Sequence, residues 1–233
     1  MDNHGILDAL RTAWHLIVTL DPNVVEYAVR SLVIASIATA VASLIGVPVG
    51  IVLGESVFRG KRAVVTVLNT MLALPTVVVG LVVYLFLRHE GPLGSLGLLL
   101  TVPGIIVGEV ILIVPIIVAL TVAAVARTDR DVRKTALALG ANARQANWIV
   151  IRESRFGVLA AVIAAFGRVV SEVGVAMIVG GNIDRFTRTM TTAIVRYVDM
   201  AEFALALALG AVLLGISLSI NVLFQYVQGG GHE

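Results

Sequence analysis

Three charged residues stand inside long apolar stretches of the sequence, where a charge needs a partner. Arg168 and Glu172 are four positions apart in the run 156–180, and Glu109 interrupts the run 98–126. Four-residue spacing places the first two side chains on one face of a helix. Because a charge in hydrocarbon costs at least about 2.5 kcal/mol, such residues normally pair or face water. We predict an ion pair that fixes helix packing, with Glu109 as a further partner, and a polar element beside a transport path as the alternative.

Hydroxyl side chains gather after this run, and their chemistry suits an oxyanion. Thr187, Thr189, Thr191 and Thr192 follow Asn182 within ten positions. A hydroxyl group donates one hydrogen bond and accepts others. These residues fit either the mouth of an anion path or ordinary capping of loops and helices, and the sequence alone favours neither.

Pro75 and Thr76 interrupt another apolar run, 63–87. A proline removes one backbone hydrogen bond and bends a helix. The carbonyl groups that it frees are tolerated in a membrane where they line water or protein. The pair is therefore a candidate part of a transport path or gate, with a plain packing kink as the alternative.

Several kinds of catalysis are excluded by what the sequence lacks. It contains no cysteine, and therefore no thiolate metal site or cysteine nucleophile. A phosphate-binding loop needs Gly, four residues and Gly-Lys-Ser/Thr, but Gly60-Lys61 is followed by Arg62 and has Glu55 at the first glycine position. The histidines lie outside the apolar runs, at His4, His15, His89 and His232. We expect no enzyme activity, catalytic residue, metal or cofactor on this chain.

The elements that must position these side chains are membrane helices. Hydrophobic residues make up 58% of the 233 positions, charged residues make up 14%, and the mean hydropathy is +0.99. Soluble domains carry about 25% charged residues. The composition therefore predicts an all-α, polytopic membrane protein that forms a single transmembrane domain over residues 1–233.

Five apolar runs are long enough to cross a hydrocarbon core, which takes about 20 helical residues. Before them, apolar and polar residues separate onto two faces over 6–20, and this pattern predicts an amphipathic helix lying on the membrane. A sixth, short span is the alternative for that segment. The predicted spans are about 32–54, 63–87, 98–126, 156–180 and 203–227.

The distribution of Lys and Arg predicts the orientation in the membrane. Three basic residues follow the first span and seven follow the third, so these two loops hold ten of the 17 in the chain. Because Lys and Arg collect in cytoplasmic loops, both loops are predicted to be cytoplasmic. Alternation then places the N-terminus outside and the C-terminus inside. The basic residues are Arg59, Lys61, Arg62, Arg127, Arg130, Arg133, Lys134, Arg144, Arg152 and Arg155.

The second of these loops, 127–155, has a defined pattern of its own. We expect a helix from Arg130 to Leu139, a stop at Gly140, and a second helix that begins with a capping box of Asn142 and Gln145. This helix–turn–helix would expose small apolar residues around the turn, namely Ala136, Leu137 and Ala141. A solvated loop whose charge only fixes the topology is the alternative.

The run "KTALALGANARQANWIVIRESRFGVLAA" resembles the cytoplasmic loop of ATP-binding-cassette importer permeases. That loop reads Glu-Ala-Ala, three residues, Gly, nine residues, and then Ile-x-Leu-Pro. Ala136, Gly140 and Val150 match the pattern. The sequence departs from it at Lys134, Thr135, Arg152 and Glu153.

The segment "FGRVVSEVGVAMIVGGNIDRFTRTMTTAI", 166–194, resembles the oxyanion permeases for molybdate, sulfate and especially tungstate. The resemblance implies the type I importer permease fold and import of a tetrahedral oxyanion, with tungstate as the expected substrate, across the cytoplasmic (inner) membrane. An ion-coupled secondary transporter or channel is the alternative function.

The resemblance also implies the partners. The permease is expected to form a homodimer in membrane lipid, with two ATPase subunits that hold ATP and Mg and an extracytoplasmic substrate-binding protein. No nucleic acid is expected. The 127–155 loop would be a coupling helix seated in the ATPase, with its contacts made by Lys134, Thr135, Ala136, Leu137, Gly140, Ala141 and Asn142.

Overall fold

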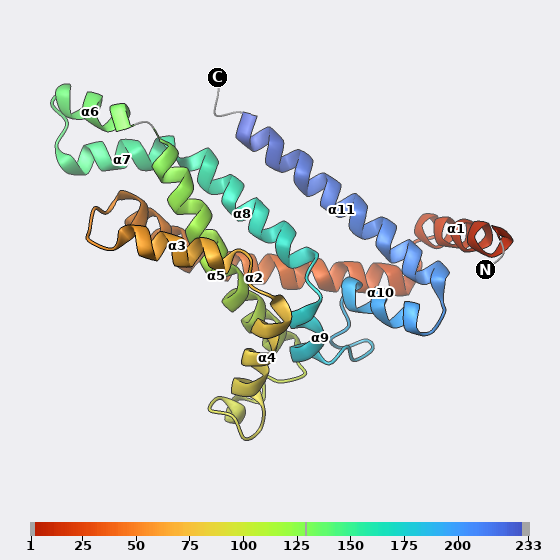
Figure 1. Ribbon diagram of the computed structural model, residues 1–233. Helices are drawn as coiled ribbons and strands as arrows, with labels where there is room; N and C mark the ends of the chain where they lie inside the picture. The colour runs from red at the N-terminus through yellow and green to blue at the C-terminus, as the bar shows by residue number, and fades with distance from the viewer. Residues whose placement is uncertain (1–2, 129, 230–233) are drawn as a thin grey trace.

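Every regular element in the described part of the chain is a helix (Figure 1). The computed structural model describes residues 3–128 and 130–229. The all-α prediction is therefore confirmed. The elements are α1 (Asn3–Val18), α2 (Pro22–Glu55), α3 (Lys61–Met71), α4 (Thr76–Leu87), the 3₁₀ turn η1 (Gly94–Leu96), α5 (Val102–Arg127), α6 (Arg130–Ala138), α7 (Ala143–Glu153), α8 (Arg155–Val170), α9 (Gly174–Gly180), α10 (Met190–Asp199) and α11 (Phe203–Gly229).

In the described part of the chain, three single helices, α2, α5 and α11, are long and apolar enough to cross a membrane. Two further spans are possible if each bent pair of helices counts as one: α3 with α4, bent by 95°, and α8 with α9, bent by 56°. The predicted runs 63–87 and 156–180 thus fall on broken helices. The first break follows from Pro75, which has no N–H to donate and disfavours a helical residue before it.

The core is built around α2 and α5, which pack very closely. Gly50 is the clearest example, because a Cβ atom there would lie 2.5 Å from the Cβ of Thr121. Small residues of this kind let two helix backbones approach each other in a membrane. The same close approach recurs at one-turn intervals, where Gly46, Gly50 and Gly54 of α2 face Ile117, Thr121 and Val125 of α5.

The two broken spans meet where they bend. A Cβ atom on Gly174, at the start of α9, would lie 2.7 Å from the Thr76 hydroxyl at the start of α4. One turn further, a Cβ atom on Gly80 would lie 3.2 Å from the Gly174 carbonyl oxygen. The break after α8 is therefore packed directly against the break before α4.

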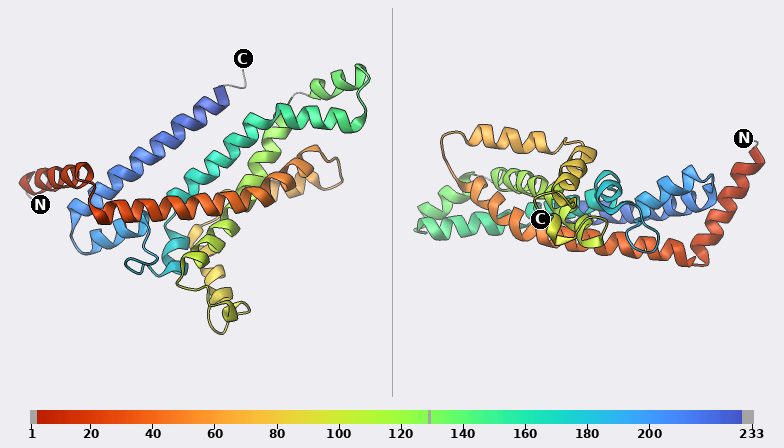
Figure 2. Two further views of the ribbon diagram at one scale, coloured as in Figure 1. Left: turned by 180° about the vertical axis from the view of Figure 1, so that it is seen from behind. Right: turned by 90° about the horizontal axis from the view of Figure 1, so that it is seen from below.

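The molecule has two distinct ends, seen in Figures 1 and 2. The helical hairpin formed by α6 and α7 projects beyond the ends of α5 and α8. The opposite end carries α10 and the loop 181–189, and α1 packs there against α11. The predicted interfacial helix corresponds to α1, whose side chains Leu10, Trp14 and Val18 are exposed. The helix α10 lies between the predicted spans 156–180 and 203–227, where no helix was predicted.

Candidate functional site

The predicted ion pair is present, but Glu172 lies in the break between α8 and α9 and not on a continuous helix. Arg168 Nη1 donates to Glu172 Oε2 at 2.6 Å. The other oxygen, Oε1, accepts hydrogen bonds from the backbone N–H groups of Gly174 at 2.7 Å and Val175 at 3.4 Å. The Glu172 side chain is 2% exposed and that of Arg168 is 38% exposed. Glu172 therefore both neutralises Arg168 and caps the first turn of α9.

A small buried cavity lies beside this pair. Its free volume is about 10 Å³, which is room for about one water molecule and none for a tetrahedral oxyanion. Glu109 is 1% exposed, and its Oε2 has no hydrogen-bond partner among the described residues. The cavity is therefore closed to an oxyanion in the present conformation. The cavity is lined by Ser31, Ile34, Ile105, Glu109, Val169, Val170, Glu172, Ala176, Thr189 and Thr191.

The predicted threonines hold their own segment together in this conformation. Thr187 Oγ1 donates to the Gly180 carbonyl at 2.6 Å and accepts from the Ile183 N–H at 2.9 Å. Thr191 Oγ1 donates to the carbonyl oxygen of Glu172 at 2.6 Å. Their hydroxyl protons are thus engaged within the protein, as the capping alternative required.

Thr189 and Thr192 form a reciprocal capping box that starts α10. The Thr192 hydroxyl accepts from the Thr189 N–H at 2.9 Å, and the Thr189 hydroxyl accepts from the Thr192 N–H at 3.4 Å. The next backbone N–H, of Met190, donates to the Ser31 hydroxyl of α2 at 2.7 Å. This contact ties the start of α10 to the wall of the cavity.

Next to these threonines lies a polar cluster of four residues, the Arg188 cluster: Tyr27, Asn182, Asp184 and Arg188. The Tyr27 hydroxyl donates to Asp184 Oδ1 at 2.8 Å, and Arg188 Nη1 lies 3.0 Å from the same oxygen. Arg188 Nε donates to Asn182 Oδ1 at 3.1 Å. The Tyr27 hydrogen bond, followed by the charge of Arg188, holds the pKa of Asp184 below its usual value.

Only Asn182 of this cluster was predicted. Tyr27 is 157 positions from Asp184, so no local pattern joins them. The available signal was Arg188 itself, which interrupts the threonine-rich run with a cation.

At the other end, the turn of the α6–α7 hairpin follows the predicted pattern. Gly140 has a left-handed φ of 90°. The Ala141 N–H donates to the Ala136 carbonyl at 3.0 Å and the Gly140 N–H to the Leu137 carbonyl at 3.1 Å, which is a Schellman ending. The expected helix boundaries and the glycine stop are confirmed to within one residue.

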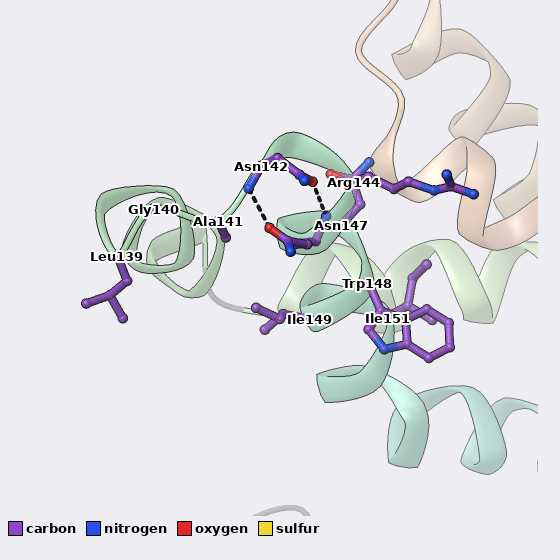
Figure 3. Close-up of a pocket in the computed structure, with 10 residues that line it drawn as sticks. Leu139, Gly140, Ala141, Asn142, Arg144, Asn147, Trp148, Ile149 and Ile151 are labelled. Carbon is purple, nitrogen blue, oxygen red and sulfur yellow. Dashed lines mark hydrogen bonds between the residues drawn. The ribbon is translucent and has the colours of Figure 1, made fainter.

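The predicted capping box is also confirmed, as Figure 3 shows. The Asn142 N–H donates to Gln145 Oε1, and the Gln145 N–H donates to Asn142 Oδ1, both at 2.9 Å. These two bonds satisfy backbone donors at the start of α7 that would otherwise lack partners. The hairpin is therefore fixed by its own residues.

The exposed surface of the hairpin differs from the prediction at two positions, Ala136 and Ala141. Ala136 is only 7% exposed, because the Schellman ending folds the chain back over it. Leu139 and Trp148 are instead the most exposed apolar side chains, at 84% and 65%. Both line an open pocket over the turn (Figure 3). Of the other predicted contact residues, Lys134, Thr135, Leu137, Gly140 and Asn142 are exposed and Ala141 is half-buried.

Known proteins resemble this chain over most of its length. The family model described as "Binding-protein-dependent transport system inner membrane component" matches residues 46–230. A tungstate uptake system permease protein of Peptoclostridium acidaminophilum is 38% identical over 96% of this chain and 98% of its own. A probable anion ABC transporter permease protein of Haloferax volcanii is 40% identical over 83% of this chain and 85% of its own.

A solved structure agrees in fold. The crystal structure of an amino acid ABC transporter matches with a TM-score of 0.67 at 14% identity, covering 90% of this chain and 94% of the other. The chain has the type I importer permease fold and belongs to the family of binding-protein-dependent transport system inner membrane components. It is a membrane transport permease subunit.

Proposed function

We propose that this chain is the permease subunit of an ATP-driven importer of tungstate. The assignment of tungstate as the substrate rests on the similarity to the Peptoclostridium acidaminophilum permease, which extends over nearly the whole of both chains. We propose a homodimer in the lipid of the inner membrane, served by two ATPase subunits and by an extracytoplasmic binding protein. ATP and Mg bind to the ATPase subunits.

The α6–α7 hairpin is the proposed contact with the ATPase. Its turn is closed by local hydrogen bonds, and it projects beyond the membrane helices with Leu139 and Trp148 exposed. Apolar side chains on a preformed projection suit a groove in a partner protein. The predicted contact residues Lys134, Thr135, Leu137, Gly140, Ala141 and Asn142 are kept, and Leu139 and Trp148 are added.

The orientation proposed is N-terminus outside and C-terminus inside. The ten basic residues of the two loops at the hairpin end support it, because Lys and Arg favour the cytoplasmic side. The Arg188 cluster then lies at the extracytoplasmic side, since it is at the opposite end from the hairpin.

The proposed path runs past the point where the two broken spans meet. Pro75 and Thr76 stand at one break, and Glu172 stands at the other. Broken helices place unpaired backbone groups and helix ends inside a membrane, where substrates of many transporters bind. Opening there requires the cavity beside Glu172 to widen from its present size. Arg168, Asn182, Thr187, Thr189, Thr191 and Thr192 remain proposed path or gate residues.

Transport into proteoliposomes tests the function. The permease and its ATPase are reconstituted with the binding protein outside, and internal tungstate is measured by mass spectrometry with and without hydrolysable ATP. We expect uptake only with ATP and binding protein, with a preference for tungstate over sulfate. Uptake that needs neither would contradict the proposal.

An ion-coupled secondary transporter is the second candidate, and one observation favours it. Glu109 is buried in the first third of α5 with an oxygen that has no partner among the described residues, and such a residue can couple ions in carriers. The same proteoliposomes separate the two functions. A carrier would accumulate tungstate under a proton or sodium gradient without ATP.

A further inference from the structure

The Arg188 cluster is built like a site for an anionic oxygen. Three donors converge on one atom, Asp184 Oδ1: the Tyr27 hydroxyl at 2.8 Å, Arg188 Nη1 at 3.0 Å and the Arg185 N–H at 3.0 Å. Arginine and hydroxyl donors in this arrangement are typical of carboxylate and oxyanion recognition. The occupant in this conformation is a carboxylate of the chain itself.

The two side-chain donors are largely buried, and the occupant is exposed. Tyr27 is 2% exposed on α2, and the Arg188 side chain is 13% exposed. Arg188 is also anchored from both sides, since its Nε donates to Asn182 and its carbonyl accepts from Arg30 Nη1 at 2.9 Å. The Asp184 side chain, by contrast, is 56% exposed. It can turn into water while Arg188 stays bonded to Asn182. The guanidinium is then largely buried without a carboxylate, which is costly unless another anion takes that place.

The Arg188 cluster adjoins the small cavity beside the Arg168–Glu172 ion pair. Ser31 follows Tyr27 by one turn of α2, and Thr189 follows Arg188 directly. Both Ser31 and Thr189 line the cavity. An anion held by Arg188 would therefore stand at the α10 side of the path, immediately before the part that must open.

We propose that the Arg188 cluster receives the tetrahedral oxyanion as it enters the permease, and that the anion displaces the carboxylate of Asp184 from Tyr27 and Arg188. This inference rests on the proposed import of an oxyanion. A doubly charged oxyanion pairs with the guanidinium more strongly than a single carboxylate does, and it offers more acceptor oxygens. Asp184 in turn competes with the bound anion, which keeps the site weak enough to release it inward.

The test measures tungstate binding to the purified permease–ATPase complex in nanodiscs, without the binding protein. Equilibrium dialysis followed by mass spectrometry reports bound tungstate. Asp184→Asn removes the competing charge and keeps an oxygen that accepts from Tyr27, so it should tighten binding by about tenfold. Arg188→Gln should weaken binding by about tenfold or more, and Arg188→Lys should fall between, because it keeps the charge but loses the planar pair of donors.

Arg196→Gln is the matched control, since Arg196 is an exposed arginine on α10 at the same end of the molecule. It should leave binding unchanged. Equal loss in Arg196→Gln and Arg188→Gln would show general charge attraction and overturn the site. A purely structural role also makes a distinct prediction: Asp184→Asn would lower the melting temperature without tightening binding, which would overturn it too.

The failure of this inference can be told from failure of the proposed function. Suppose that the wild-type complex imports tungstate but the Asp184 and Arg188 variants bind it as the wild type does. This result refutes only the proposed role of the Arg188 cluster. Absence of tungstate import by the wild-type complex refutes the function on which it rests.

Discussion

The two ends of the molecule are held by different kinds of contact. The α6–α7 hairpin is closed by hydrogen bonds between residues at most five positions apart, such as Ala141 to Ala136 and Asn142 to Gln145. The α10 end is joined by bonds that cross 157 to 159 positions, from Tyr27, Arg30 and Ser31 of α2.

This difference separates two tasks. A segment fixed by its own residues keeps its shape when a partner moves it, which suits a coupling element. A segment that is hydrogen-bonded to a helix far away in the sequence changes its position only when that helix moves as well. We therefore expect movement of the hairpin to reach the α10 end through the membrane helices and not through the hairpin's own unfolding.

The comparison depends first on the two ends facing opposite sides of the membrane. The chain has no cysteine, so single cysteines introduced at Ser95 and Asn142 are unique labelling sites, and both positions are exposed. In intact cells an impermeant thiol reagent should label the Ser95→Cys variant fully and the Asn142→Cys variant not at all. Permeabilised cells should show both labelled. The reverse pattern in intact cells would contradict the orientation.

Enlarging the turn of the hairpin should uncouple transport. Gly140→Trp places a bulky side chain at a φ of 90°, which non-glycine residues adopt at a cost of about 1–2 kcal/mol, and it blocks the proposed contact. We expect at least about a tenfold loss of ATP-dependent uptake, equivalent to about 1.4 kcal/mol, with normal membrane insertion.

Gly97→Trp is the control for the strain alone. Gly97 also has a left-handed φ, of 59°, and open space where a Cβ atom would lie, but it lies in the η1 loop away from the hairpin. Uptake should survive in that variant. Equal uptake in the Gly140 and Gly97 variants would remove the coupling role.

The ion pair at the centre should act as a unit. Arg168→Met leaves the buried carboxylate of Glu172 without its cation, and this loss reaches about 3 to 5 kcal/mol for a fully buried pair. Because the Arg168 side chain is 38% exposed, we expect a smaller loss. The double variant Arg168→Met with Glu172→Gln should assemble better than Arg168→Met alone.

The measurement is a double-mutant comparison of assembled complex and of uptake per complex. One outcome would reverse this assignment. If Arg168→Met assembles normally but transports nothing, and the double variant does not recover, Arg168 contacts the anion directly.

The smallest effect is expected at the bond between α2 and α10. Ser31→Ala removes the acceptor of the buried Met190 N–H, which costs about 1–3 kcal/mol. The melting temperature of the purified complex should fall by several degrees. Ser36→Ala on the same helix is the control, because Ser36 is exposed, and its melting temperature should stay at the wild-type value. No difference between the two variants would mean that this bond does not hold the α10 end.

The sequence predicted features that depend on near neighbours. The hydrogen bonds around Gly140 and in the Asn142–Gln145 box join residues at most five positions apart, so the residue types predict the turn. The five apolar runs were visible for the same reason. Pro75 predicted a bend where α3 and α4 meet at 95°, but hydropathy counts apolar residues and not their direction, so the 56° break between α8 and α9 was not predicted.

Features that depend on distant neighbours were missed. Glu172 accepts a hydrogen bond from Thr191 through its backbone, and Tyr27 meets Asp184 only after the chain has folded. Two features of near neighbours were missed as well. The helix α10 starts from a Thr–Thr box in place of the usual Ser/Thr with Glu or Gln, so its start was not recognised. Ala136 was expected to be exposed, but the chain folds back over it after Gly140.

The glycine contacts between α2 and α5 also determine which mutations this protein tolerates. Every other amino acid has a Cβ atom, and at Gly46, Gly50 and Gly54 that atom would come within 2.9 Å of a side-chain atom of α5. Any missense change in these three codons therefore pushes the two helices apart, whatever the chemistry of the new residue. In a library of all single substitutions, these three positions should be depleted of every variant, including alanine, at intervals of four along α2.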